Sequence, residues 1–204
     1  QDYFISTFLF VLVFALVGIY SYPQEDALIL YRYALNLAES GEIVFNINDK
    51  PTEGATDFLW MVALSVLAIF KLDPFLSSLV ISSLCFFAIL KIFYENIYKE
   101  NNLYFYILFV FLFLNTGQVI GSSLYGFSTL IFCSIGFLMY VYAFRGNFKI
   151  WSLFSIIFCL FRPEGLIFFL PSIFIAFQNV KSKNEFYNFS IYFTLVLISG
   201  LIYF

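Results

Sequence analysis

The 204-residue sequence contains no histidine, and its cysteines stand alone. Without histidine, a general base that works near neutral pH has to be a carboxylate or, less readily, a lysine, tyrosine or cysteine side chain. Cys85, Cys133 and Cys159 each lie inside an apolar run, and no two of them form a CxxC pair. This spacing argues against a Cys/His metal site, and we interpret the three thiols as small apolar side chains.

Charged residues are also scarce. They make up 11% of the chain, whereas soluble domains carry about 25%. The net charge is −3 and the basic residues are scattered, so the sequence offers no nucleic-acid interface and no basic tract for anionic lipid. Hydrophobic residues make up 62% of the chain. Several apolar runs approach the roughly 20 residues that cross a lipid bilayer, and the composition therefore predicts an all-α polytopic membrane protein.

The apolar runs divide the chain into expected helices. They are Phe4–Tyr20, Phe58–Phe70, Phe75–Ile92, Leu103–Ile120, Leu124–Phe144, Ile150–Phe161, Leu166–Phe177 and Phe189–Phe204. The three shortest would rise only about 18–20 Å as helices, less than the hydrocarbon core of about 30 Å, and half-length helices often flank a cavity. The first run lacks a basic leader and a cleavage site, so we interpret it as a retained span. The last run is still apolar at Phe204, and we expect residues 1–204 to be the N-terminal part of a longer transmembrane domain.

The basic residues predict which loops share a side of the membrane. They occupy alternate loops, as Lys91 and Lys99, Arg145 and Lys149, and Lys181 and Lys183. These loops face the cytoplasm together if the Phe58–Phe70 segment is re-entrant or interfacial. The opposite, external face then carries Pro23–Asp57, Asn115–Gly126 and Arg162–Glu164.

The most polar stretch of the chain reads "PQEDALILYRYALNLAESGEIVFNINDKPTEGATDFLW", from Pro23 to Trp60. Its first part predicts an amphipathic helix that starts near Pro23, has an acidic first turn and stops at Gly41. Polar residues recur on one helical face at Glu25, Arg32 and Asn36. "NINDKP" predicts a turn, and "TEGATDFLW" leads back to an apolar segment. From the residues alone, an ordinary amphipathic connector with solvated charges is the favoured interpretation.

The same stretch resembles the first external loop of a bacterial family of GT-C glycosyltransferases, which includes the mycobacterial terminal arabinofuranosyltransferases. The family's loop reads approximately DDAFITFRYARNLAxGxGxVFNxGExVEGxTxFLW, and the match extends over some 35 residues with almost no gaps. A second family motif, RPEG, is present as Arg162 to Gly165. The resemblance implies a GT-C helix bundle whose external loop, residues 21–57, follows the first span. It also implies inverting transfer from a polyprenyl-phosphate sugar to a glycan or protein acceptor, on the periplasmic side of the inner membrane.

The resemblance assigns roles to individual residues. Asp26 occupies the second position of the family's acidic pair and is the expected general base, while Glu25 is an assistant in orientation or metal binding. Arg162 offers bidentate geometry to a lipid phosphate. From the residues alone, RPEG is also explained as a helix break with an internal Arg–Glu ion pair. Glu164 is either a substrate contact or a support for Arg162. Some GT-C enzymes use a divalent cation beside the acidic motif, so a metal stays open.

Arg32 and Tyr33 match the family's RYA motif, and Glu53 lies on its VEG motif, so the resemblance places all three near the substrate. Other interpretations remain open for them. Arg32 is equally well explained by an ion pair with Glu25 or Glu39. Tyr33 and Trp60 are candidates for stacking on a sugar or prenyl chain, although aromatic residues are expected at any membrane interface.

The chain departs from the family at two points. Its first acidic position is Glu25 instead of aspartate, and Phe127-Ser128 replaces a Leu-Glu pair, which removes a carboxylate. The second departure favours an alternative function, a non-catalytic GT-C-like scaffold or accessory subunit of a larger membrane complex. A transporter is disfavoured because no inverted repeat is visible and most acidic residues lie in loops.

Overall fold

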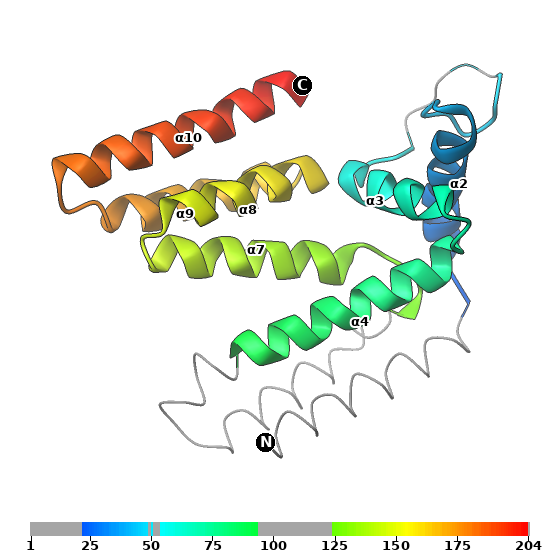
Figure 1. Cartoon of the computed structure of the whole chain (residues 1–204), viewed down its shortest axis with the longest axis horizontal. Helices are drawn as coiled ribbons and strands as arrows, with labels where there is room; N and C mark the ends of the chain where they lie inside the picture. Colours follow the sequence, from blue (N-terminus) through cyan, green and yellow to red (C-terminus); the bar gives the residue numbers. More distant parts are fainter. Residues whose placement is uncertain (1–21, 49, 51–53, 94–123, 204) are drawn as a thin grey trace, which may run out of the picture. The chain divides into compact units, whose positions relative to one another are not determined.

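The structure is a computed structural model that describes residues 22–48, 50, 54–93 and 124–203 (Figure 1). Throughout these residues the regular secondary structure is α-helical. The all-α prediction is therefore confirmed for the described part of the chain. The expected segments Phe4–Tyr20 and Leu103–Ile120 lie outside it.

The helices follow the apolar runs closely. They are α2 (Glu25–Ser40), α3 (Phe58–Ile69), α4 (Pro74–Phe93), α7 (Thr129–Phe144), α8 (Phe148–Phe161), α9 (Gly165–Gln178) and α10 (Lys183–Tyr203). The chain forms two compact units. One comprises Gln1–Ala55 and Met61–Ile131, and the other Thr56–Trp60 and Phe132–Phe204.

In the first unit, the amphipathic helix α2 packs on α4. Tyr31 of α2 is buried, and its hydroxyl lies 2.9 Å from Ser78 Oγ and donates to the Gly126 carbonyl at 3.1 Å. Gly126 has φ +85°, and a Cβ there would overlap the Tyr31 hydroxyl. The position therefore requires glycine for both its backbone conformation and its space.

The C-terminal end of α2 is closed as the sequence predicts. Gly41 adopts the left-handed conformation, with φ +76°, and its N–H donates to the Leu37 carbonyl. The chain then folds back on the helix, because Asn36 Nδ2 donates to the carbonyls of Val44 and Phe45 at 2.9 and 2.8 Å. Asn36 is buried, so this part of the polar face binds the following loop and does not project into solvent.

In the second unit, α8 lies between its neighbours and packs on both α9 and α10. Figure 1 shows α7, α8, α9 and α10 running side by side. Trp151 of α8 is fully buried between Phe169 of α9 and Phe189 of α10, with ring centroids 5.8 and 5.7 Å away. Its indole N–H donates to Ser172 Oγ at 3.2 Å. Aromatic stacking thus fixes α9 and α10 against α8.

Three expected boundaries differ from the structure. Helix α2 begins at Glu25, so Pro23 precedes it. Helix α7 begins at Thr129 and not at Leu124, because the positive φ of Gly126 interrupts the run. Helix α10 begins at Lys183, before its apolar part. The Glu185 carboxylate accepts the N–H groups of Lys181 and Ser182, and this capping arrangement starts the helix in polar sequence.

Among the described residues, no single helix is both long and apolar enough to cross a membrane. Helix α3 and residues Pro74–Ile89 of α4 meet the length and composition requirement together, but their axes are bent by 119°.

Candidate functional site

The RPEG motif forms a tight turn between α8 and α9. Arg162 is extended, with φ −146° and ψ 145°, as expected for a residue that precedes proline. Gly165 begins α9 and approaches α8 closely, since a Cβ there would lie 2.5 Å from the Phe158 carbonyl oxygen. The glycine allows the two helices to meet immediately after the turn, and the turn presents Arg162 at their shared end.

Asp57 is the ion-pair partner of Arg162. It directly precedes α3 and is buried, with 7% of its surface exposed. Its Oδ1 lies 2.7 Å from Arg162 Nε. The Nε–H bond does not point at this oxygen well enough to form a hydrogen bond, so the contact is purely ionic. Both residues belong to the second unit, and the contact joins the end of the polar loop to RPEG.

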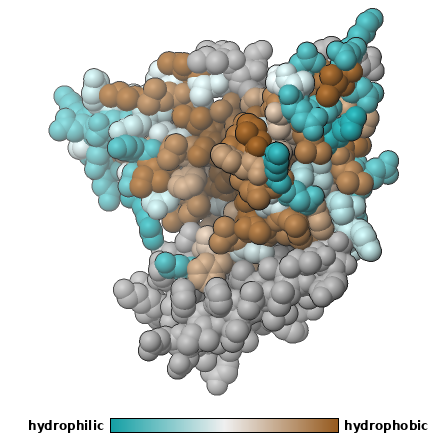
Figure 2. Space-filling model, turned by 45° about the vertical axis from the view of Figure 1, so that its right-hand side comes forward, coloured by the Kyte–Doolittle hydropathy of each residue, from teal (hydrophilic) through white to brown (hydrophobic). Residues whose placement is uncertain are grey.

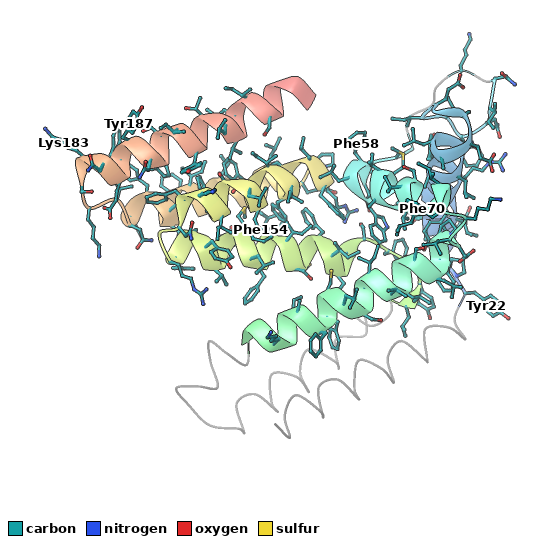
Figure 3. The ribbon with its side chains drawn as sticks, viewed as in Figure 1. Tyr22, Phe58, Phe70, Phe154, Lys183 and Tyr187 are labelled. Carbon is teal, nitrogen blue, oxygen red and sulfur yellow. The ribbon has the colours of Figure 1, made fainter. Side chains whose placement is uncertain are left out.

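Aromatic rings surround this ion pair. The guanidinium carbon of Arg162 lies 5.7 Å from the ring centroid of Phe132, within cation–π range. Phe132 stacks on Phe158 at 4.2 Å, and the ring of Trp60 lies 6.4 Å from that of Phe161. Figure 3 shows the start of α3, marked by Phe58, beside the end of α8. The apolar surroundings lower the local dielectric and strengthen each electrostatic interaction in the cluster.

Glu164 contributes a second carboxylate. Its Oε2 lies 3.9 Å from Arg162 Nε, and 55% of its side chain is exposed. At this separation and exposure the attraction is weak and is screened by salt. Asp57 is therefore the principal counter-ion of Arg162, and the exposed Glu164 adds a negative potential near the pair.

The acidic pair Glu25 and Asp26 lies on the first turn of α2, and both side chains are exposed. The partial positive charge of the helix N-terminus favours carboxylates in this turn. The pair belongs to the first unit, whereas Arg162 belongs to the second. The expectation that Asp26 and Arg162 converge in one site stays a prediction.

The other expected site residues of the first unit have internal contacts. Arg32 Nε donates to the Phe45 carbonyl at 3.2 Å, and this bond takes the place of the expected ion pair with Glu25 or Glu39. Tyr33 is 2% exposed and packs against the ring of Phe45, with centroids 5.9 Å apart. Both residues hold the folded-back loop. Their assignment to substrate binding stays a prediction, and Glu53 lies outside the described residues.

Asp57 was given no role by sequence reasoning. A usable indication was present, because an acidic residue directly before an apolar helix is typical of an N-cap position. The pairing with Arg162 was not predictable, since no sequence spacing connects the two.

Metal ligands do not cluster in the described residues, where no three cysteine or carboxylate side chains are placed to share an ion. Comparisons with models of protein families, with curated proteins and with solved structures gave no match.

Proposed function

We propose that this chain belongs to a membrane glycosyltransferase of the GT-C type. It transfers a sugar from a polyprenyl-phosphate donor to a glycan or protein acceptor, on the periplasmic face of the bacterial inner membrane. The observation that carries the proposal is the ion pair of Asp57 and Arg162. Each residue comes from a different segment that resembles the family, and a shared site requires those segments to meet.

The surface of the second unit supports a membrane environment. Large apolar side chains are exposed along α9 and α10, among them Phe174 at 71% and Ile167 at 67%. Figure 2 shows hydrophobic side chains over much of the visible helical surface. Contiguous exposed apolar surface of this kind marks contact with lipid or with a partner. Lipid contact is the choice that agrees with the apolar composition of the whole chain.

The residues divide the chemistry as follows. Asp26 accepts the proton of the acceptor hydroxyl during attack on the sugar, and Glu25 helps to orient the acceptor. Arg162 stabilises the phosphate as its bond to the sugar breaks. General-base catalysis contributes about 10²–10⁴-fold, and the remaining acceleration comes from orientation and charge stabilisation.

Transfer from a polyprenyl-phosphate sugar, measured in membranes that contain the full-length protein, tests this function. Arg162→Lys keeps the charge but loses the bidentate geometry, so KM for the donor should rise before kcat falls. Lys149→Arg, a charge-conserving change on exposed α8 surface, is the matched control and should leave both constants unchanged. Wild-type membranes that transfer no sugar from donors of this class would contradict the proposal.

A non-catalytic scaffold is the second candidate. It is favoured by Ser128, which occupies the family's glutamate position and is 1% exposed at the start of α7. A buried serine supplies neither the charge nor the reach of a glutamate. Under this alternative the Asp57–Arg162 pair only fixes the residues at the start of α3 against the α8–α9 turn.

A further inference from the structure

We propose that Trp60, Arg162 and Asp57 form a phosphate-binding site in which the Trp60 indole N–H is a hydrogen-bond donor to the ligand. The identification of the ligand as a polyprenyl phosphate rests on the proposed function. The residues themselves are singled out by their geometry, by burial and by unused hydrogen-bonding capacity.

The Trp60 indole N–H is a buried donor without an acceptor in the described part of the chain. The side chain is 1% exposed. A buried polar group that lacks a partner is unfavourable, and most buried donors in proteins are satisfied. Trp151 illustrates the usual case, because it is equally buried and its N–H donates to Ser172 Oγ. Trp60 thus retains a donor that packing alone does not explain.

Trp60 lies close to the ion pair. It follows Asp57 by three residues at the start of α3, and residues with this spacing are neighbours on one helical face. Its ring lies against Phe161, the residue before Arg162. The unused indole donor and the guanidinium therefore belong to one cluster.

Arg162 supplies the positive charge of the site and Asp57 positions it. Arg162 Nε is a second buried N–H that lacks a hydrogen-bond acceptor among the described residues, although Asp57 Oδ1 is in ionic contact with it. The pair is neutral overall, and the exposed Glu164 adds one negative charge nearby. A site of this charge suits the single negative charge of a sugar phosphodiester better than a multiply charged phosphate.

Ligand entry requires a side chain to move, because the Trp60 nitrogen has no exposed surface. Arg162 is suited to this movement. Its side chain is 28% exposed and is held to Asp57 by charge without a hydrogen bond. A small shift of this side chain, with the ionic contact to Asp57 retained, would let a phosphate reach both the guanidinium and the indole N–H.

The test compares Trp60→Phe with Trp151→Phe in the full chain. Both changes keep an aromatic ring, and both remove one indole N–H of equal burial. Binding of a polyprenyl-phosphate sugar, a phosphodiester with one negative charge, in lipid nanodiscs and the Tm of the ligand-free protein are measured for each variant. Trp60→Phe should bind the lipid phosphate about tenfold more weakly, because it loses a hydrogen bond to a charged acceptor. Its Tm should fall less than that of Trp151→Phe, by a difference of about 2–4 °C.

The positioning role of Asp57 has a separate readout. Asp57→Asn should weaken binding on the order of tenfold, and Asp57→Glu, which restores the charge, should recover part of the loss. Glu164→Gln should strengthen binding by about two- to fivefold at low salt, because it removes a repulsive charge. A merely structural Asp57 would leave the affinity of the folded variants unchanged.

Two outcomes separate this inference from the proposed function. Equal affinity of the wild type and Trp60→Phe would overturn the inference and leave the donor class intact. A wild-type chain that binds no polyprenyl-phosphate sugar would overturn both.

Discussion

Neutralising both members of the Asp57–Arg162 pair should destabilise the protein by clearly less than the sum of the two single losses. The attraction at 2.7 Å is about 6 kcal/mol for an effective dielectric constant near 20, and desolvation of the two groups offsets most of it. Removing one partner of a buried pair leaves an uncompensated charge, which costs about 3–5 kcal/mol.

The two single variants should lose different amounts of stability, because the two side chains differ in exposure. In Asp57→Asn the stranded charge is Arg162, which is 28% exposed and partly hydrated, so we expect a loss of about 2 kcal/mol. In Arg162→Met the stranded charge is Asp57, only 10% exposed, and we expect about 3 kcal/mol. The double variant strands neither charge and should lose about 3 kcal/mol instead of the summed 5, a coupling of about 2 kcal/mol.

Thermal unfolding in detergent, followed by tryptophan fluorescence, measures the three variants. Each kcal/mol corresponds to about 2–4 °C in a domain of this size. Glu164→Gln serves as the control, because its longer and more exposed contact should change the stability by less than about 0.5 kcal/mol. Additive losses for Asp57→Asn and Arg162→Met would refute the reasoning, since independent residues show no coupling.

Other predictions concern the packing of the two units. Gly126→Ala should lower the Tm sharply in the wild-type background and less in a Tyr31→Phe background, where the overlapping hydroxyl is absent; equal losses would show that φ strain alone matters. Burial raises the pKa of Tyr31 to about 12. The charge of nearby Asp73 also raises this pKa, and the hydrogen bond to Ser78 lowers it in part. The Tyr31 hydroxyl therefore loses its proton at a lower pH in the unfolded chain than in the folded chain. Its contribution to the free energy of unfolding is complete below pH 10 and should fall by about 2–3 kcal/mol as the pH rises to 12. The free energy of unfolding of Tyr31→Phe, measured over the same alkaline range, should not show this decrease. Gly165→Ala should cost several degrees in Tm, because its Cβ meets backbone atoms that cannot rotate away; an unchanged Tm would show that α8 and α9 separate easily.

Much of the fold could be predicted because most of the described helices are continuous apolar runs with clear ends. The bounds of α8 and α9 follow directly from the hydrophobic segments and the Pro163–Gly165 break. The start of α10 was wrong because an apolar criterion cannot detect a helix that begins in polar sequence. The SxxE spacing of Ser182 and Glu185 was the available indication, and it acts through backbone capping and not through hydrophobicity.

The candidate site was only partly predictable. The resemblance of RPEG to the family motif identified Arg162, and the proline at position 163 indicated the turn that presents it. The Asp57 partner depends on a tertiary contact between the residue before α3 and the residue after α8, and no periodic pattern in the sequence predicts this contact. Arg32 shows the opposite error, because its place on a polar helix face suggested an ion pair, whereas its Nε donates to the carbonyl of Phe45.

The most direct test of the glycosyltransferase proposal is sugar transfer by the Asp26→Asn variant of the full-length protein. Asp26 is exposed on the first turn of α2, so its loss should change helix stability by only about 0.3–1 kcal/mol. The isosteric amide cannot accept the proton of the acceptor, and turnover should fall by about 10²–10⁴-fold while expression and donor binding persist. Turnover by Asp26→Asn at the wild-type rate would contradict the assignment of Asp26 as the base, and absence of transfer by the wild type as well would favour the scaffold.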